Sequence, residues 1–301
     1  MELPDLASLG LRPVALDAVR STLAESPRWD PVSNTLWWVD ILGSALHRLA
    51  PGPVQTSWDL DIAAGAVILT DGPEIILAAA DGFHLVEPDT GASRLIATLE
   101  PDLLSRRMND AGVDSLGRIY AGTMRWDAGI GPDDGVLYRL DRDGRVEPLL
   151  RGLGCPNGLA WIRGDLLAFI DSLAKRIDFW NVDIPSGSLL GIASSIDTST
   201  FDGIPDGMTL DSAGRLWVAF WGGGVVRSFE HDGEVHATIE VGTPFVSSVC
   251  FGGDDLRTLF MTTARDDDRT ANPADDHGGS LFACRPGATG AEPFRWSAPS
   301  S

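Results

Sequence analysis

The sequence has few cysteines, no long apolar run and no basic N-terminal segment. Its three cysteines, Cys155, Cys250 and Cys284, form neither a CxxC motif nor an even set for a disulfide framework, so we expect a reducing, cytoplasmic setting. The N-terminal Met-Glu-Leu-Pro-Asp is not basic, and no long apolar stretch follows it; no signal peptide is therefore expected. No segment approaches the roughly 18 consecutive apolar residues that indicate a membrane-spanning helix.

Basic residues are also scarce. The 301 residues contain 23 Lys and Arg against 43 Asp and Glu, which gives a formal net charge of −20. Nucleic acids and anionic membrane surfaces bind proteins through basic surfaces, so neither is an expected partner. The simplest role of the acidic excess is solubility, and it could also draw a cation towards a channel.

Several catalytic signatures are missing as well. The sequence has no GxSxG motif, no HExxH motif and no glycine-rich phosphate-binding loop. Its five histidines are scattered along the chain, at His47, His84, His231, His236 and His277. None of them lies at the repeat position described below, so we expect neither a His-based metal site nor a His-activated nucleophile.

What the chain does contain is a sixfold repeat. Each repeat has a short apolar strand, a tight turn of Asp, Ser or Gly, and a second strand dense in aromatic and aliphatic residues. The second strands begin about 40 to 50 residues apart, the interval typical of one four-stranded propeller blade. They are residues 36–40, 75–78, 118–123, 166–171, 215–220 and 257–261.

These repeats predict an all-β fold, because a single such unit cannot bury both faces of its sheet and several must stack around an axis. We therefore predict a six-bladed β-propeller with four-stranded antiparallel blades. No linker interrupts the chain, so residues 1–301 are expected to form a single domain. The blades are predicted to begin near residues 24, 63, 108, 156, 205 and 247, and residues 1–22 could complete the last blade.

Polar residues recur at one position of the repeat. About nine to eleven residues before each second strand, at the start of the innermost strand, four blades carry a carboxylate or an amide. These residues are Glu25, Asn109, Asn157 and Asp206; the other two blades have Ser247-Ser248 and Ala64-Gly65. Converging carboxylate and amide oxygens favour one divalent cation, Ca²⁺, Mg²⁺ or Mn²⁺ and less obviously Zn²⁺. The alternative is that these side chains only cap turns and bond backbone amides.

Three further residues lie close to this position in the sequence. Arg107 precedes Asn109 by two residues, and its guanidinium could hold a substrate oxygen or simply lie on the surface. Asp127 follows the second strand of the third blade, where an exposed, solvated loop is the simpler interpretation. Asp171 ends the second strand of the fourth blade, where it could support the site from behind or join a structural hydrogen-bond network.

The ordered motifs resemble a known family. They are Glu25-Ser26-Pro27-Arg28-Trp29, Arg107-Met108-Asn109-Asp110, Pro156-Asn157-Gly158-Leu159, Asp171-Ser172-Leu173, Pro205-Asp206-Gly207-Met208 and Cys250-Phe251-Gly252-Gly253. Together they are similar to the SMP-30/gluconolactonase/luciferin-regenerating-enzyme (LRE) family over nearly the whole chain. This resemblance implies a six-bladed propeller that holds one divalent metal in its channel and hydrolyses sugar lactones.

The resemblance also implies roles for individual residues. Glu25, Asn157 and Asp206 would bind the metal, and Arg107 and Asn109 would contact the substrate. Asp127 stands where the family often has a Glu that touches sugar hydroxyls, so it is a candidate substrate contact with a shorter side chain.

The resulting hypothesis is a metal-dependent carboxylic-ester hydrolase that opens aldonolactones such as gluconolactone or xylonolactone. The metal (Ca, Zn, Mg or Mn) would polarise the carbonyl, and Asp206, or less favourably Glu25, would act as general base. A promiscuous metal-dependent esterase or phosphotriesterase is one alternative, and a non-catalytic propeller scaffold is another. The expected partner is a small sugar lactone, and the expected state is a monomer.

Overall fold

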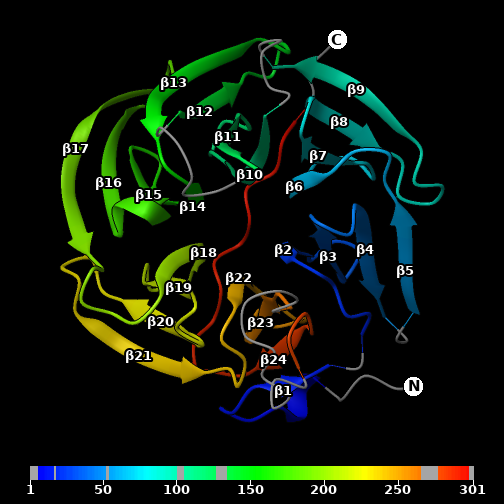
Figure 1. Ribbon diagram of the computed structural model, residues 1–301, viewed down its shortest axis with the longest axis vertical. Coiled ribbons are helices and arrows are strands. Elements are labelled where there is room, and N and C mark those ends of the chain that lie inside the picture. The colour runs from blue at the N-terminus through cyan, green and yellow to red at the C-terminus, as the bar shows by residue number, and fades with distance from the viewer. Residues whose placement is uncertain are drawn as a thin grey trace. The chain divides into compact units, whose positions relative to one another are not determined.

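A computed structural model describes residues 6–16, 18–51, 54–99, 105–126, 134–265 and 277–297. These residues form six four-stranded antiparallel sheets, the blades of a β-propeller (Figure 1). The only helices among them are two short 3₁₀ segments, Leu6–Ser8 and Ser172–Ala174. The predicted all-β, six-bladed fold is thus confirmed. No helix in the described ranges is long and apolar enough to cross a membrane.

The chain divides into two compact units of three sheets each. The first unit consists of Met1–Asp59 and Asp197–Glu292. Its sheets are β2 (Ala24–Asp30), β3 (Thr35–Asp40), β4 (Ala45–Ala50) and β5 (Val54–Asp59); β18 (Ile204–Leu210), β19 (Leu216–Trp221), β20 (Val225–Phe229) and β21 (Val235–Glu240); and β22 (Val246–Gly252), β23 (Thr258–Thr263), β24 (Phe282–Cys284) and β1 (Val14–Ala15).

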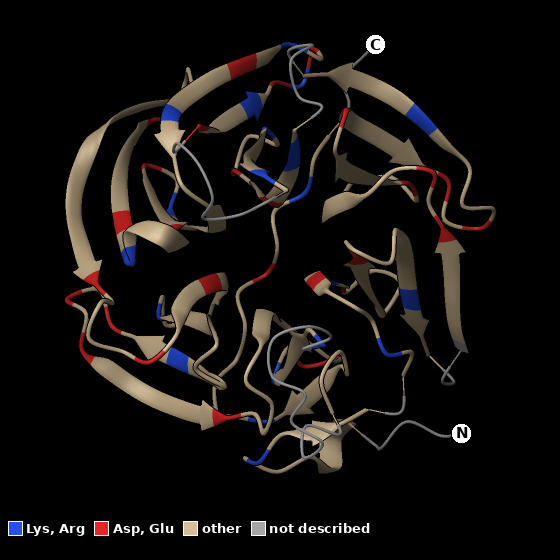
Figure 2. Ribbon diagram, viewed as in Figure 1, with Lys and Arg blue, Asp and Glu red and all other residues tan. Residues whose placement is uncertain are grey.

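The second unit consists of Leu60–Ile196 and Pro293–Ser301. Its sheets are β6 (Ala64–Leu69), β7 (Ile75–Ala79), β8 (Gly82–Val86) and β9 (Ser93–Thr98); β10 (Arg106–Val113), β11 (Ile119–Arg125), β12 (Gly135–Leu140) and β13 (Val146–Leu153); and β14 (Pro156–Arg163), β15 (Leu166–Asp171), β16 (Arg176–Asp183) and β17 (Ser188–Asp197). Figure 2 shows acidic residues spread over strands and turns of the sheets in both units rather than gathered in one block.

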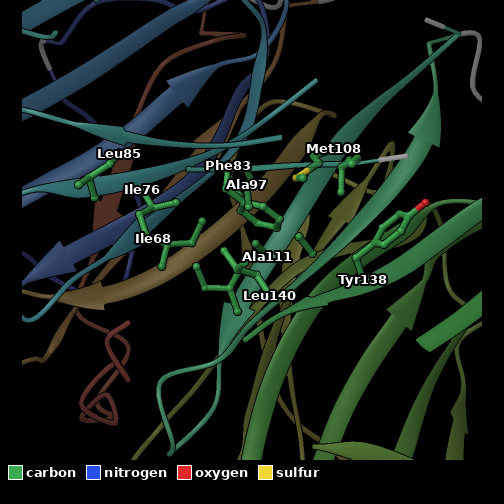
Figure 3. Close-up of a cluster of buried hydrophobic side chains, with 14 of the residues drawn as sticks. Ile68, Ile76, Phe83, Leu85, Ala97, Met108, Ala111, Tyr138 and Leu140 are labelled. Atoms are coloured by element: carbon green, nitrogen blue, oxygen red, sulfur yellow. The ribbon is translucent and has the colours of Figure 1, made fainter. Parts of the chain in front are cut away.

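Burial falls from the first strands of each sheet to the last. Every residue of β3, β7 and β23 is buried, whereas β9 and β21 are mostly exposed. The aromatic and aliphatic residues that mark the second strands therefore pack between neighbouring sheets. In the second unit, Phe83, Met108 and Tyr138 join one such cluster between the sheets β6–β9 and β10–β13 (Figure 3).

An Asp turn joins the first strand to the second in blades of both units. In each case one carboxylate oxygen accepts hydrogen bonds of 2.9 Å from two backbone N–H groups: Asp114 from Leu116 and Arg118, and Asp211 from Ala213 and Arg215. Both turns contain a glycine with positive φ, Gly117 at +78° and Gly214 at +85°, which a side chain would strain. Because the two turns are equivalent, the pairing register of the first strand with the second is the same beside the turn in both blades.

The three cysteines are buried and form no disulfide. Burial raises the pKa of the Cys250 thiol to about 12 and that of Cys284 to about 12. Both therefore stay protonated at neutral pH and pack as small apolar groups.

Strand β1 is the fourth strand of the sheet β22–β24, where Val14 pairs with Ala283 and Ala15 with Phe282. The next residue, Leu16, donates its backbone N–H to Leu281 O at 2.8 Å. Its side chain is buried among residues of β2, β3, β23 and β24. The N-terminal segment thus covers the edge that β24 would otherwise expose, a common site of unwanted strand pairing.

We predict that Leu16→Ala lowers the free energy of unfolding by about 2–4 kcal/mol, because it removes a buried side chain and leaves a cavity. Leu11→Ala is the matched control, since Leu11 is 69% exposed and its loss should have little effect. Urea unfolding followed by tryptophan fluorescence measures both. Equal midpoints for the two variants would contradict the packing of Leu16.

Candidate functional site

A β-bulge interrupts the innermost strand of all six sheets at the same repeat position. In β2, β10, β14 and β18, two residues face one residue of the second strand; in β6 and β22, one residue is left without a partner. The residues at these bulges are Ser26-Pro27, Asn109-Asp110, Asn157-Gly158, Asp206-Gly207, Gly65 and Ser247; Glu25 pairs with Val39 directly before the first of them. Bulges turn side chains out of the regular alternation of a strand and are common beside active sites.

In the first unit, one buried carboxylate lies directly before a bulge and another lies on one. Glu25 is 5% exposed and Asp206 is 6% exposed. One carboxylate oxygen of Glu25 accepts a hydrogen bond of 2.9 Å from the backbone N–H of Ser26. Ser26 itself lies in the left-handed region, with φ of +51°, a conformation that is uncommon for serine and frequent at functional sites. The local fold therefore holds the Glu25 carboxylate on a strained turn.

Strand β22 packs against both β2 and β18 in this unit. Ser247, its bulge residue, donates from Oγ to the Ala24 carbonyl at 2.5 Å, and its Oγ lies 2.9 Å from Thr262 Oγ1. Ala24 immediately precedes Glu25, so Ser247 fixes the backbone that carries this carboxylate.

In the second unit, the bulges carry amides beside an arginine. The Arg107 guanidinium donates to Asn109 Oδ1 at 2.6 Å and to the Met108 carbonyl at 3.1 Å, and it lies 5.7 Å from the ring centroid of Trp126. Asn109 in turn donates from Nδ2 to the Pro156 carbonyl at 3.0 Å. Arg107 and Asn109 are both buried, and this network joins β10 to β14.

Asn157 has a defined amide orientation. Its Nδ2 donates to Ser172 Oγ at 3.1 Å, which leaves Oδ1 as the atom that turns away from this hydrogen bond. Oδ1 is buried and has no hydrogen-bond partner among the described residues. Leaving a buried carbonyl oxygen without a hydrogen-bond partner lowers the stability of a native protein. Such an oxygen is a suitable ligand for a hard divalent cation.

The residues present therefore fit a divalent cation. Within the described ranges, no three or more His, Cys, Asp or Glu side chains gather as metal ligands, so a site built on the two carboxylates must also draw on amide oxygens or water. Oxygen donors without nitrogen or sulfur suit Ca²⁺, Mg²⁺ or Mn²⁺ better than Zn²⁺.

Asp171 supports the loop that leads into Asn157. Its two carboxylate oxygens accept hydrogen bonds from the backbone N–H groups of Gly154, at 3.0 Å, and Cys155, at 2.9 Å. These are backbone hydrogen bonds of the loop, and the prediction that Asp171 supports the site from behind stays a prediction. Asp127 lies outside the described residues, so its predicted substrate contact stays a prediction.

Two residues of this region have no role assigned from the sequence. Ser172 is buried and orients Asn157, and its signal in the sequence is its place in the motif Asp171-Ser172-Leu173. Trp126 is 45% exposed and stacks on Arg107. The sequence feature that could have indicated Trp126 is its position as an aromatic residue directly after a second strand, where the chain leaves the sheet.

Six four-stranded antiparallel sheets, each with a bulge in its innermost strand, define the class of this protein as a six-bladed β-propeller. A family model, the SMP-30/gluconolactonase/LRE-like region, matches residues 23–265. The chain belongs to this family, which confirms the resemblance seen in the sequence.

Individual relatives agree with this assignment. The chain is 36% identical over 285 residues to pentonolactonase XacC of Haloferax volcanii, which covers 91% of this chain and 94% of the relative. It is 33% identical to the putative sugar lactone lactonase YvrE of Bacillus subtilis, with the same two coverages of 91% and 94%. The crystal structure of regucalcin from Agrobacterium tumefaciens, described as a calcium-binding protein, superposes with a TM-score of 0.88 at 29% identity, over 96% of this chain and 98% of that one.

We predict that Asp171→Ala lowers the free energy of unfolding by about 1–3 kcal/mol, because two backbone N–H groups lose their acceptor. Asp165→Ala is the control: Asp165 forms an exposed ion pair with Arg163, and exposed pairs contribute little. Chemical denaturation of both variants checks this. An Asp171→Ala protein as stable as Asp165→Ala would show that the loop does not need the carboxylate.

Proposed function

We propose that this protein is a carboxylic-ester hydrolase that opens sugar lactones to the free sugar acids and depends on one divalent cation. The observation that carries the proposal is the buried Asn157 Oδ1, which has no hydrogen-bond partner among the described residues. It lies on a bulge equivalent to the one that carries the buried Asp206 and to the one that directly follows the buried Glu25. Relatives named as a pentonolactonase and a putative sugar lactone lactonase support lactone hydrolysis as the reaction. The aldonolactones, five- or six-membered cyclic esters of sugar acids, are the proposed substrates.

Glu25, Asn157 and Asp206 are the proposed ligands of the cation. A regucalcin structure described as calcium-binding supports a metal in this family. Calcium, magnesium, manganese and zinc all stay candidates, with the oxygen donors favouring the first three. When bound, the cation supplies Lewis-acid polarisation of the lactone carbonyl.

Asp206 is the proposed general base. One oxygen of Glu25 already accepts the Ser26 N–H, which leaves that carboxylate fewer lone pairs to take a proton. Asp206 lies in its bulge beside Gly207, a residue without a side chain, and is buried. In this role Asp206 takes the proton of the attacking water as the water adds to the carbonyl carbon. The same proton can then pass to the ring oxygen as the C–O bond of the ester breaks.

Arg107 and Asn109 are the proposed substrate-orienting residues, and Asp127 is a further proposed contact. Arg107 is held by Asn109, by the Met108 carbonyl and by the ring of Trp126, so little side-chain freedom is lost when it binds a sugar hydroxyl. A guanidinium fixed in advance aligns the polyol and places the carbonyl for attack. The monomeric state and the cytoplasmic setting expected from the sequence stay predictions.

Chelation followed by a substrate panel tests the proposed function. Treatment with EDTA should abolish hydrolysis of gluconolactone and xylonolactone, and one or more of Ca²⁺, Mg²⁺, Mn²⁺ and Zn²⁺ should restore it, as measured by acid release in a pH-stat. Hydrolysis of an aryl phosphotriester, measured in the same assay, distinguishes a lactonase from the alternative phosphotriesterase. Full lactonase activity in a protein shown to be free of metal would contradict the cation requirement.

The pair Asp206→Ala and Asp206→Asn separates metal binding from proton transfer. Alanine removes the ligand, so both cation binding and turnover should be lost. Asparagine keeps a carbonyl oxygen but cannot accept the proton, so we expect weakened cation binding with kcat reduced by about 100-fold or more. Asp197→Ala is the control, because Asp197 is exposed and its carboxylate accepts the Ser199 N–H in a turn. Undiminished lactone hydrolysis by Asp206→Ala would be incompatible with the proposal.

A further inference from the structure

Ser248 is a buried serine of the first unit to which the proposed chemistry assigns no role. Ser248 follows the bulge residue Ser247 on β22 and is 0% exposed. Its Oγ has no hydrogen-bond partner among the described residues, whereas the neighbouring Ser247 Oγ donates to the Ala24 carbonyl. A buried hydroxyl without a partner destabilises the fold relative to a paired one, so an apolar residue would be the more stable choice here.

The surroundings of Ser248 indicate what the hydroxyl is for. Its side chain lies directly against Gly207, since a Cβ added to Gly207 would fall 2.0 Å from Ser248 Oγ and 2.5 Å from Ser248 Cβ. Gly207 is the second residue of the bulge that Asp206 begins. The two positions are therefore matched: the missing side chain at 207 makes the room that the serine fills, and the hydroxyl lies beside the turn that carries the Asp206 carboxylate.

The backbone of Ser248 is fixed independently of this hydroxyl. Its carbonyl accepts a hydrogen bond of 3.3 Å from Thr262 Oγ1, and its pairing partner in the sheet is Thr262. Ser248 is thus held in place by its strand, while no described residue engages its hydroxyl. A rigid donor is more useful than a mobile one for holding a charged acceptor, because little entropy is lost when the hydrogen bond forms.

We propose that Ser248 is a positioning residue for Asp206: in the cation-bound protein its hydroxyl donates a hydrogen bond to the Asp206 carboxylate and holds that carboxylate in the orientation that binds the ion. This inference rests on the proposed function, because it assigns Asp206 as a ligand. A neutral donor to a ligating carboxylate fixes the oxygen that faces the ion, and such supporting contacts typically change metal affinity by about 10- to 100-fold.

Ser228 provides a matched control in the same unit. It lies on β20, is also 0% exposed, and its Oγ likewise has no hydrogen-bond partner among the described residues. It pairs with Trp217 and Ala237 rather than with bulge residues. Ser228→Ala thus makes the same chemical change in an equally buried place without touching the Asp206–Gly207 turn.

The test compares Ser248→Ala with Ser228→Ala in two measurements on the full chain. Cation affinity is measured by calorimetric titration of metal-stripped protein with CaCl₂ and MnCl₂, and stability by urea unfolding of the metal-stripped protein. We expect Ser248→Ala to bind the cation about tenfold more weakly, with unchanged or higher stability because an unpaired buried hydroxyl is removed. Ser228→Ala should likewise have unchanged or higher stability to urea, and it should bind the cation as tightly as the wild type.

The outcomes separate this inference from the proposed function. Normal cation binding by the wild type and by Ser248→Ala would overturn the role of Ser248 alone. Weaker binding accompanied by an equal loss of stability, or an equal loss of affinity in Ser228→Ala, would show a general structural effect and would also overturn it. A wild-type protein that binds neither cation would overturn the proposed metal site and this inference together.

Discussion

The structure depends on one local departure from regular sheet pairing, the bulge in each innermost strand. In an uninterrupted antiparallel ladder, side chains alternate between the two faces, and here β10 packs against both β6 and β14, and β22 against both β2 and β18. A polar side chain in such a ladder would be buried against apolar neighbours. The bulge releases Asn109, Asn157 and Asp206 from the alternation and stops the pairing beside Glu25. The strands can therefore keep an apolar core while presenting oxygen atoms in one place along their length.

Residues without large side chains let neighbouring sheets pack around these bulges. A Cβ on Gly65 would lie 2.3 Å from the backbone oxygens of Met108 and Asn109, and one on Gly122 would lie 2.3 Å from Pro156 Cβ. Both contacts belong to the second unit, where β10 packs against β6 and against β14. The contact of Gly207 with Ser248 does the same in the first unit. Functional geometry and sheet packing thus depend on the same few positions, so a change at one of these glycines would alter both.

Much of the fold and the candidate positions could be predicted from the sequence, because the repeat is regular in a way that residues reveal. The aromatic second strands mark each sheet, and the Asp turns of Asp114 and Asp211 keep the first strand at a constant offset from the second. Counting back from the second strand therefore reaches Asn109 and Asp206. The bulges themselves could not be predicted, since they arise from pairing between strands. The same holds for the orientation of the Asn157 amide, which the Ser172 hydroxyl determines from the 3₁₀ segment that follows β15.

The two units differ in what their bulges present, and this difference bears on the chemistry. The first unit has the Asp206 carboxylate on one bulge and the Glu25 carboxylate directly before another, next to a strand that supplies serine hydroxyls. The bulges of the second unit carry the Asn109 and Asn157 amides, with the Arg107 guanidinium beside Asn109. Carboxylates attract a cation and accept protons, and the unpartnered Asn157 Oδ1 is the proposed third ligand, whereas Arg107 and Asn109 are the proposed contacts of a polyol. Substitutions at Glu25, Asp206 and Asn157 should therefore act mainly on cation binding and, at Asp206, on proton transfer. Those at Arg107 and Asn109 should act mainly on how tightly and in what orientation the lactone binds, because a fixed donor contributes binding energy to the ground state as well as to the transition state.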